Sequence, residues 1–183
     1  MDHPDLRERI HDDMGRVFTE LGEMVAFQSV HDAEQAPPEE CDKMVDWLLE
    51  TFSGLGVADV EAHVTSDGSK AVTGSLAGPD DAPTVLLYFH HDVQPPLGAD
   101  EWDSPVWELT DRGGRWYGRG AADCKGNIAV HLAALRALGG EMPVNIKIIG
   151  EGSEEQGTGG LEEFVPEHRD LLAADAILVV DSG

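Results

Sequence analysis

The spacing of apolar residues predicts two amphipathic helices at the start of the chain. Over residues 6–27 the apolar positions recur at steps of three and four, which places them on one stripe of a helix. A second helix is predicted over residues 39–55. Pro37 and Pro38 precede it, and proline and acidic residues both favour a helix start. Gly56 follows its end.

Three later runs of consecutive apolar residues predict strands that are covered on both faces, because a strand with one wet face would alternate. They are residues 84–89, 144–149 and 176–180. Shorter elements fill the remaining length: strands near residues 60–64, 71–76 and 115–117, a helix over residues 127–138, and a short helical stretch around residues 161–164. Alternation of helices with doubly buried strands predicts an α/β layered sheet, whose function lies in loops beyond the strand ends.

Charge narrows the classes of function. The chain has 183 residues with 12 Lys and Arg against 36 Asp and Glu, a formal net charge of −24. So acidic a chain has no basic surface for the phosphates of a nucleic acid, and anionic membrane surfaces repel it. We therefore expect small ligands or cations as partners. Its hydrophobic content of 41% still suffices for a core.

Localisation signals are missing from the sequence. No apolar run approaches the roughly 20 residues that span a bilayer, and the start has no basic region followed by an apolar stretch. Cys41 and Cys124 are too few for a disulfide framework. We therefore expect neither membrane insertion nor export, and a cytoplasmic location.

Side chains able to hold a metal or move a proton follow the ends of the predicted buried strands. They are His90 and Asp92, then Glu151, Glu154 and Glu155, then Asp181, with Asp123 in the turn before a helix. One imidazole with several carboxylates suits zinc, manganese or cobalt. A lone acidic residue is usually solvated surface, but a carboxylate directly after a buried strand is half enclosed, and a divalent cation satisfies it.

Two short patterns within this set have a chemical logic. In the His-x-Asp pattern, His90 can ligate through one ring nitrogen while Asp92 holds the other ring N–H. His91 between them is expected on the opposite face, as a structural or surface residue. The pair Glu154 and Glu155 offers one carboxylate to a metal and its neighbour as a general base.

Four ordered segments carry a family resemblance: YFHHDVQPP (88–96), WYGRGAADCKGN (116–127), GEGSEEQGTGGL (150–161) and LVVDSG (178–183). Their order and spacing resemble the dinuclear-zinc metallopeptidases that include carnosinase, cytosolic nonspecific dipeptidase, succinyl-diaminopimelate desuccinylase and acetylornithine deacetylase. The resemblance looks closest to the dipeptidase branch. It implies a three-layer α/β/α catalytic domain with a mostly parallel central sheet.

The resemblance implies a role for each matching residue. His90, Asp123, Glu155 and Asp181 are similar to the metal ligands of two Zn²⁺ ions, with Mn²⁺ or Co²⁺ possible, and Asp123 is similar to the carboxylate that bridges both. Asp92 is similar to the residue that orients His90, and Glu154 to the general base on a bridging water. The Asp123–Cys124 peptide bond is expected to be cis. Cys124 stands where many dipeptidases have a second Asp, which weakens the dipeptidase assignment.

The implied activity is hydrolysis of the peptide bond of dipeptides or short peptides. Family members are about twice as long, with a dimerising lid domain and a late His ligand. Residues 1–183 are therefore interpreted as the N-terminal part of the catalytic domain, and the full protein is expected to be a homodimer. Two alternatives stay open at this point: an amidohydrolase that deacylates N-acyl amino acids, and a truncated metal-binding fragment without catalysis.

Overall fold

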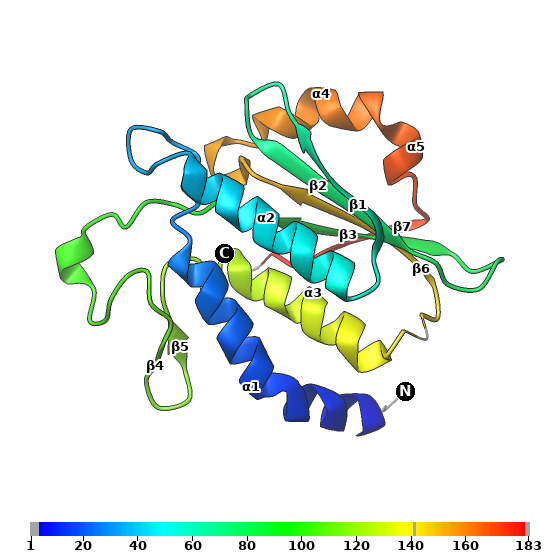
Figure 1. The fold of residues 1–183 in the computed structure, drawn as a ribbon, viewed down its shortest axis with the longest axis horizontal. Helices are drawn as coiled ribbons and strands as arrows, with labels where there is room; N and C mark the ends of the chain where they lie inside the picture. The colour runs from blue at the N-terminus through cyan, green and yellow to red at the C-terminus, as the bar shows by residue number, and fades with distance from the viewer. Residues whose placement is uncertain (1–3, 141, 182–183) are drawn as a thin grey trace.

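A central five-stranded sheet organises the fold, in the order β1-β2-β6-β3-β7 (Figure 1). The computed structural model describes residues 4–140 and 142–181. Glu141 and the last two residues of the LVVDSG segment lie outside the described residues. The strands are β1 (Ala58–Val64), β2 (Lys70–Leu76), β3 (Thr84–His90), β6 (Asn145–Glu151) and β7 (Ala176–Val179).

Strand directions confirm a mostly parallel sheet. β6 and β7 each pair in parallel with β3, whereas β2 is antiparallel to both β1 and β6. Four strands therefore share one direction and β2 alone opposes it. In this register His90 lies beside Glu151, so the carboxyl ends of β3 and β6 meet at one edge of the sheet.

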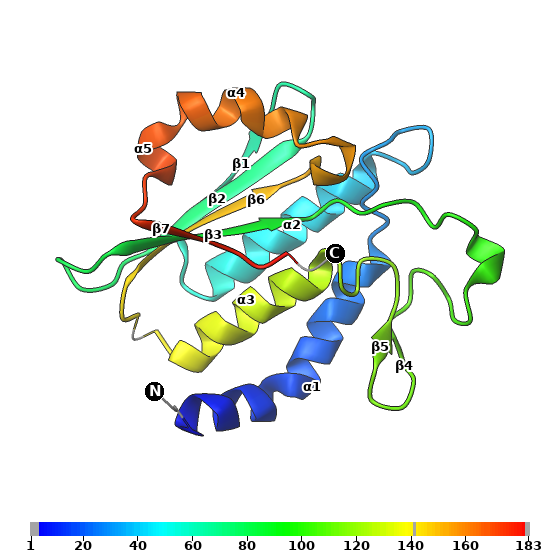
Figure 2. The same cartoon turned by 180° about the vertical axis from the view of Figure 1, so that it is seen from behind.

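Helices cover both faces and complete the predicted three layers (Figures 1 and 2). On one face lie α1 (Pro4–Ala26), α2 (Glu39–Gly54) and α3 (Lys125–Leu138); on the other lie α4 (Gly159–Glu167) and α5 (Arg169–Leu172). α2 packs on β1 and β2, α3 packs on β3, and α1 packs on α3. The helix α3 ends at Gly139, whose left-handed conformation at φ 65° suits a glycine cap.

The main apolar core lies between the sheet and the layer of α1, α2 and α3. Phe52 of α2 and Phe89 of β3 are both almost fully buried there, and their rings stack with centroids 5.6 Å apart. A second, smaller cluster lies on the opposite face, where Phe164 of α4 packs over the sheet near Leu86 and Ile149. Burial on both faces of β3 and β6 confirms the prediction made from their consecutive apolar residues.

For β7 the prediction of a strand covered on both faces was wrong. Ile177, Leu178 and Val179 are 59%, 48% and 52% exposed. Among the described residues β7 is an edge strand that pairs with β3 alone, and α4 and α5 pack over β2 and β6 instead. An apolar run predicts a strand, but burial depends on which elements reach it.

The segment between β3 and α3 contains short elements that the sequence pattern missed in part. Residues 99–101 form a 3-10 turn, η1 (Ala99–Glu101). The strand predicted near residues 115–117 is β5 (Trp116–Tyr117), and it pairs with the unpredicted β4 (Thr110–Asp111). Two-residue strands carry too little periodicity to be recognised from one sequence.

Candidate metal centre

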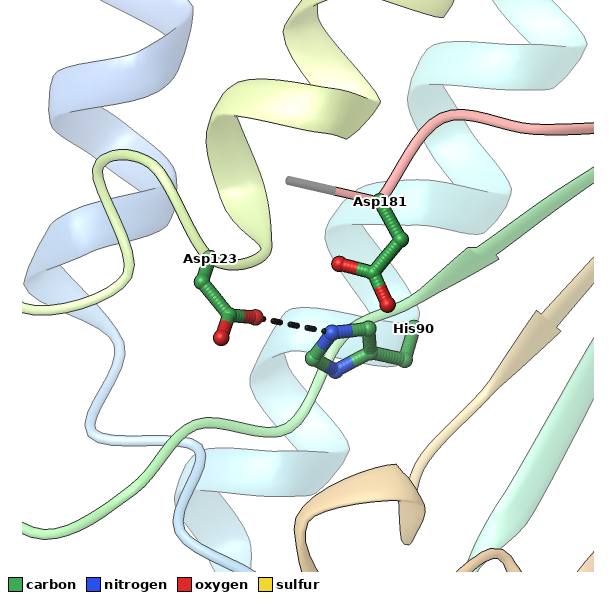
Figure 3. Close-up of side chains that lie close together, drawn as sticks. All are labelled: His90, Asp123 and Asp181. Carbon is green, nitrogen blue, oxygen red and sulfur yellow. Dashed lines mark ion pairs between the residues drawn. The ribbon is translucent and has the colours of Figure 1, made fainter. Parts of the chain in front are cut away.

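Three predicted ligands converge at the edge of the sheet. His90 is the last residue of β3, Asp123 lies in the loop before α3, and Asp181 follows β7. One ligand atom from each lies within 4.8 Å of the others. Figure 3 shows the carboxylates of Asp123 and Asp181 directed toward the His90 ring, and His90 Nε2 lies 3.0 Å from Asp123 Oδ1. Asp123 lies 33 positions after His90, and Asp181 lies 58 positions after Asp123. β3 and β7 are parallel neighbours, so His90 and Asp181 meet at one edge of the sheet, and the loop before α3 brings Asp123 to them.

Asp92 connects the histidine to the Glu154–Glu155 pair. Its carboxylate Oδ1 accepts a hydrogen bond from His90 Nδ1 at 3.3 Å and from the Glu154 backbone N–H at 3.1 Å. Its Oδ2 accepts the Glu155 backbone N–H, also at 3.1 Å. A carboxylate bound to Nδ1 leaves Nε2 free to act as a ligand, which is the orienting role that the His-x-Asp pattern predicts.

The protonation state of His90 follows from these neighbours. Burial acts to lower the pKa of His90, but its contacts with Asp92 and Cys124 outweigh burial and raise the pKa to about 12. Without a metal ion the imidazole is therefore a cation at neutral pH, paired with Asp123. A metal ion must displace that proton, since only neutral imidazole ligates.

The two glutamates lie in η2 (Glu154–Gln156), directly after β6. Glu154 Oε2 is 4.0 Å from His90 Nε2. Burial raises the pKa of Glu154, and the nearby carboxylates of Glu155 and Asp92 add to the effect against the opposing charge of His90. Glu155 points elsewhere, because its Oε2 accepts a hydrogen bond from Gln94 Nε2 at 2.8 Å. Glu155 is thus outside the group of three, and its ligand role stays a prediction.

The donor atoms at this edge fit a divalent cation. Among the described residues, His90 Nε2 and Asp123 Oδ1 are buried and face each other as an ion pair 3.0 Å apart, and Glu151 Oε2 is buried with no hydrogen-bond partner. Buried polar atoms in proteins almost always have a partner, so Glu151 Oε2 needs an explanation. An imidazole nitrogen with carboxylate oxygens is a ligand set that zinc accepts, and a cation would replace the proton between His90 and Asp123.

Comparison with known proteins agrees with this chemistry. A model of the family described as Peptidase family M20/M25/M40 matches residues 86–183, which is more than half of the chain. The chain belongs to this peptidase family. The matched region contains all six residues predicted for the site.

Curated relatives within the family are dipeptidases. The chain is 40% identical over 174 residues to the cysteinylglycine-S-conjugate dipeptidase of Corynebacterium striatum, covering 92% of this chain and 37% of the relative. It is 34% identical over 179 residues to the human Beta-Ala-His dipeptidase, covering 88% and 35%. The chain therefore spans little more than a third of the length of these relatives. The dipeptidase branch suggested by the sequence motifs is confirmed.

Solved structures of the family share the fold. Human carnosine dipeptidase 1 superposes with a TM-score of 0.86 at 30% identity, covering 98% of this chain and 41% of that one. The dipeptidase Dug1p of Saccharomyces cerevisiae gives a TM-score of 0.87 at 22% identity, again over 98% and 41%, and supports the fold alone.

The structure of this peptidase chain adds a pair that sequence reasoning missed. The Tyr88 hydroxyl donates a hydrogen bond to Glu151 Oε1, and Glu151 is almost fully buried at the end of β6. Burial raises the pKa of Glu151 to about 7, although the bond from Tyr88 acts against it. The sequence did contain a signal, because Tyr88 lies two residues before His90 and therefore on the same face of β3.

Cys124 has a structural environment. The Asp123–Cys124 peptide bond is cis, as expected from the family resemblance. The Cys124 side chain is fully buried, burial raises the pKa of its thiol to about 11, and its Sγ donates to the backbone oxygen of Asp92 at 3.0 Å. A neutral thiol with this partner helps to hold Asp92.

Proposed function

We propose that the intact protein hydrolyses dipeptides at two zinc ions held by His90, Asp123, Glu155 and Asp181. The convergence of His90, Asp123 and Asp181, whose ligand atoms all lie within 4.8 Å of one another, carries the proposal. Membership of the peptidase family and relatives named as dipeptidases support the reaction. Mn²⁺ or Co²⁺ would suit the same ligand types.

Each ligand would contribute through a defined atom. His90 would bind through Nε2, since Asp92 occupies its Nδ1. Asp123 points its carboxylate toward the His90 ring, and its two oxygens could each bind one ion, which suits a bridge between two ions. Glu155 would have to exchange its hydrogen bond with Gln94 for a metal ligand. Bound zinc supplies a Lewis acid that lowers the pKa of a coordinated water to about 7.

Glu154 is proposed as the general base. Its carboxylate lies beside the cluster, about a third exposed, and a water could therefore reach it. Burial and the neighbouring carboxylates raise its pKa above the ordinary value of a glutamate, which makes it a stronger base. Glu154 would take a proton from the attacking water and deliver it to the leaving amine.

Dipeptides are the proposed substrates, and deacylation of N-acyl amino acids is not favoured, because the relatives named above are dipeptidases. A homodimer and a cytoplasmic location complete the proposal. The two free cysteines suit a reducing compartment. Among the described residues, no helix is both long and apolar enough to cross a membrane.

The test is Glu154→Gln in the intact protein, with zinc content and hydrolysis of a dipeptide panel measured together. The variant keeps the side chain's shape but removes the base, so zinc should stay bound while kcat falls by about 10²–10⁴-fold. Glu162→Gln is the matched control, because Glu162 is exposed on α4 away from the centre. A near-normal rate for Glu154→Gln, or no hydrolysis by the unmodified protein, would overturn the proposal.

A further inference from the structure

The turn between β1 and β2 holds a small network of hydroxyl groups around Asp67. Asp67 Oδ1 accepts hydrogen bonds from Thr65 Oγ1 at 2.8 Å and from the Ser69 backbone N–H at 3.0 Å. The hydroxyls of Thr65 and Ser69 lie 2.7 Å apart. Both of these residues are buried, although Asp67 itself lies on the exposed side of the turn. We name residues 65–69 the support turn.

The support turn reaches the loop that carries the two glutamates. Ser69 Oγ donates a hydrogen bond to Ser153 Oγ at 3.3 Å, while the backbone N–H of Ser69 is held by Asp67. Ser153 is fully buried and directly precedes Glu154. Its backbone oxygen accepts the N–H groups of Gln156 at 3.1 Å and Thr158 at 2.9 Å, so Ser153 anchors the whole of η2.

The far end of the same loop also contacts the support turn. A Cβ placed on Gly160 would lie 2.7 Å from Thr65 Oγ1 and 2.8 Å from Asp67 Oδ1, which are distances that real Cβ atoms do not show. Only glycine therefore permits this approach. Loop residues 153–160 are thus held at both ends by one turn that is 84 residues away in sequence at the Ser69–Ser153 bond.

The loop needs such external support because its backbone is unfavourable on its own. Gly157 and Thr158 are consecutive residues with positive φ, at 95° and 61°. A β-branched residue such as threonine is uncommon in this region, and such conformations persist where surrounding contacts enforce them. On the opposite side of the loop, Asp92 binds the backbone N–H groups of Glu154 and Glu155.

The geometry points to Asp67 as a positioning residue that, through Ser69 and Ser153, fixes the loop carrying Glu154 and Glu155 at the metal centre. The inference rests on the proposed function of those two glutamates. Asp67 would touch neither substrate nor metal. It would act from one side of the loop as Asp92 acts from the other.

A simpler reading is that Asp67 only closes its own turn, as aspartate often does. That interpretation accounts for its bonds to Thr65 and Ser69, but it leaves the Ser69–Ser153 bond and the close approach of Gly160 to Thr65 and Asp67 unexplained. Partial burial alone would raise the pKa of Asp67, but its hydrogen bonds with neighbouring groups outweigh burial, so the pKa lies well below its ordinary value. A turn-closing role predicts lower stability without a change in kcat.

The first experiment measures kcat and KM for a dipeptide in Asp67→Ala, Asp67→Asn and Ser153→Ala forms of the intact protein. Ser66→Ala, an exposed position in the same turn, is the matched control. Replacing a residue that orients a metal ligand typically lowers metal affinity or activity by about 10–100-fold. We expect Asp67→Ala and Ser153→Ala to lower kcat by about that factor with KM within twofold, and Asp67→Asn, which keeps an acceptor oxygen, to restore most of it.

A double variant tests whether the two residues act together. Asp67→Ala combined with Ser153→Ala should cost little more in kcat than either change alone, because both changes interrupt the same chain of contacts from Asp67 through Ser69 to Ser153. Multiplicative losses would contradict the contact. Wild-type kcat in Asp67→Ala, while Glu154→Gln is inactive in parallel, would overturn the positioning role and leave the proposed function standing.

The second experiment does not depend on catalysis. Hydrogen exchange of the backbone amides of Glu154 and Glu155 is measured in the metal-free protein. We expect faster exchange in Asp67→Ala than in Ser66→Ala, with the exchange of β3 unchanged. Equal exchange in the two variants would overturn the inference even if the protein proved to have another activity. If Asp67→Ala does not fold, Ser153→Ala gives the same comparison.

Discussion

His90 and His91 are neighbours at the end of β3, equally buried, and yet opposite in chemistry. His90 points to the metal centre, where contacts with Asp92 and Cys124 outweigh burial and raise its pKa to about 12. His91 points to the other face of the sheet, where its Nε2 donates to the Lys70 backbone oxygen at 3.1 Å. Burial lowers the pKa of His91 to about 4.

The difference lies in the partners and not in the residue type or its depth. A carboxylate against one ring makes it a cation that a metal ion can replace, whereas a backbone carbonyl against the other leaves it neutral. Position along the strand decides which partners each ring meets, since successive side chains point to opposite faces. Depth of burial alone would therefore not identify the ligand.

Replacing each histidine in turn should give the largest difference in zinc affinity. His90→Ala removes the only imidazole of the group of three, so zinc affinity should fall by more than the roughly 100-fold that loss of an outer partner costs. His91→Gln, which keeps an N–H donor for Lys70, should leave zinc affinity nearly unchanged. Isothermal titration of both variants with zinc checks this, and equal losses would show that the two rings are not distinct.

Asp92→Asn tests the partner that makes His90 different. Asparagine keeps one oxygen but presents an NH₂ group where the carboxylate accepts backbone or ring N–H groups. We expect zinc affinity to fall by about 10–100-fold with the fold retained. Competition with a chelator of known affinity measures the loss. Unchanged affinity would mean that Asp92 does not orient His90.

The low pKa of His91 predicts how stability depends on pH. Its pKa is depressed in the folded state, so the stability that it contributes is present above its unfolded value near 6.5 and is lost as pH falls through about 4. Between those values the slope should approach about 1.4 kcal/mol per pH unit. Urea unfolding of the metal-free protein measures it. His91→Gln should flatten this slope, and an unchanged slope would exclude His91 as its source.

Gly152→Ala should give the smallest effect. A Cβ at Gly152 would lie 2.7 Å from His91 Cε1, so the ring has to shift, at a cost of about 1–3 kcal/mol in stability. Gly54→Ala is the control, because nothing lies within 4 Å of that position and it is helical. Thermal melting of both variants measures the difference, and Gly152→Ala should melt at the lower temperature. Equal melting temperatures would contradict the tight packing on His91.

Much of the fold follows from periodicity, and the exceptions have local causes. Apolar spacing predicts the helices α1, α2 and α3 and the strands β3 and β6, and the burial of their apolar residues confirms it. The exposure of β7 does not follow from its sequence, because it depends on the absence of a covering helix over that edge among the described residues. Pairing partners across a sheet are non-local, and one sequence does not encode them in a readable pattern.

The sequence predicted part of the site, as it predicted part of the fold. Placing chemistry after buried strands brought His90, Asp123 and Asp181 into one prediction, and the structure places them together. The hydrogen bond of Glu155 to Gln94 was not predicted, since it depends on side-chain direction in an irregular loop. The pairing of Tyr88 with Glu151 needed the register of β3 against β6, which only the structure supplies.

The most direct measurement is the position of zinc in crystals of the protein grown with zinc and located by anomalous scattering. The account predicts zinc at about 2.0–2.2 Å from His90 Nε2 and from oxygens of Asp123 and Asp181, which are ordinary zinc bond lengths. Zinc bound only at other residues, with His90 Nε2 still paired to Asp123, would contradict the assignment of this edge of the sheet as the metal centre.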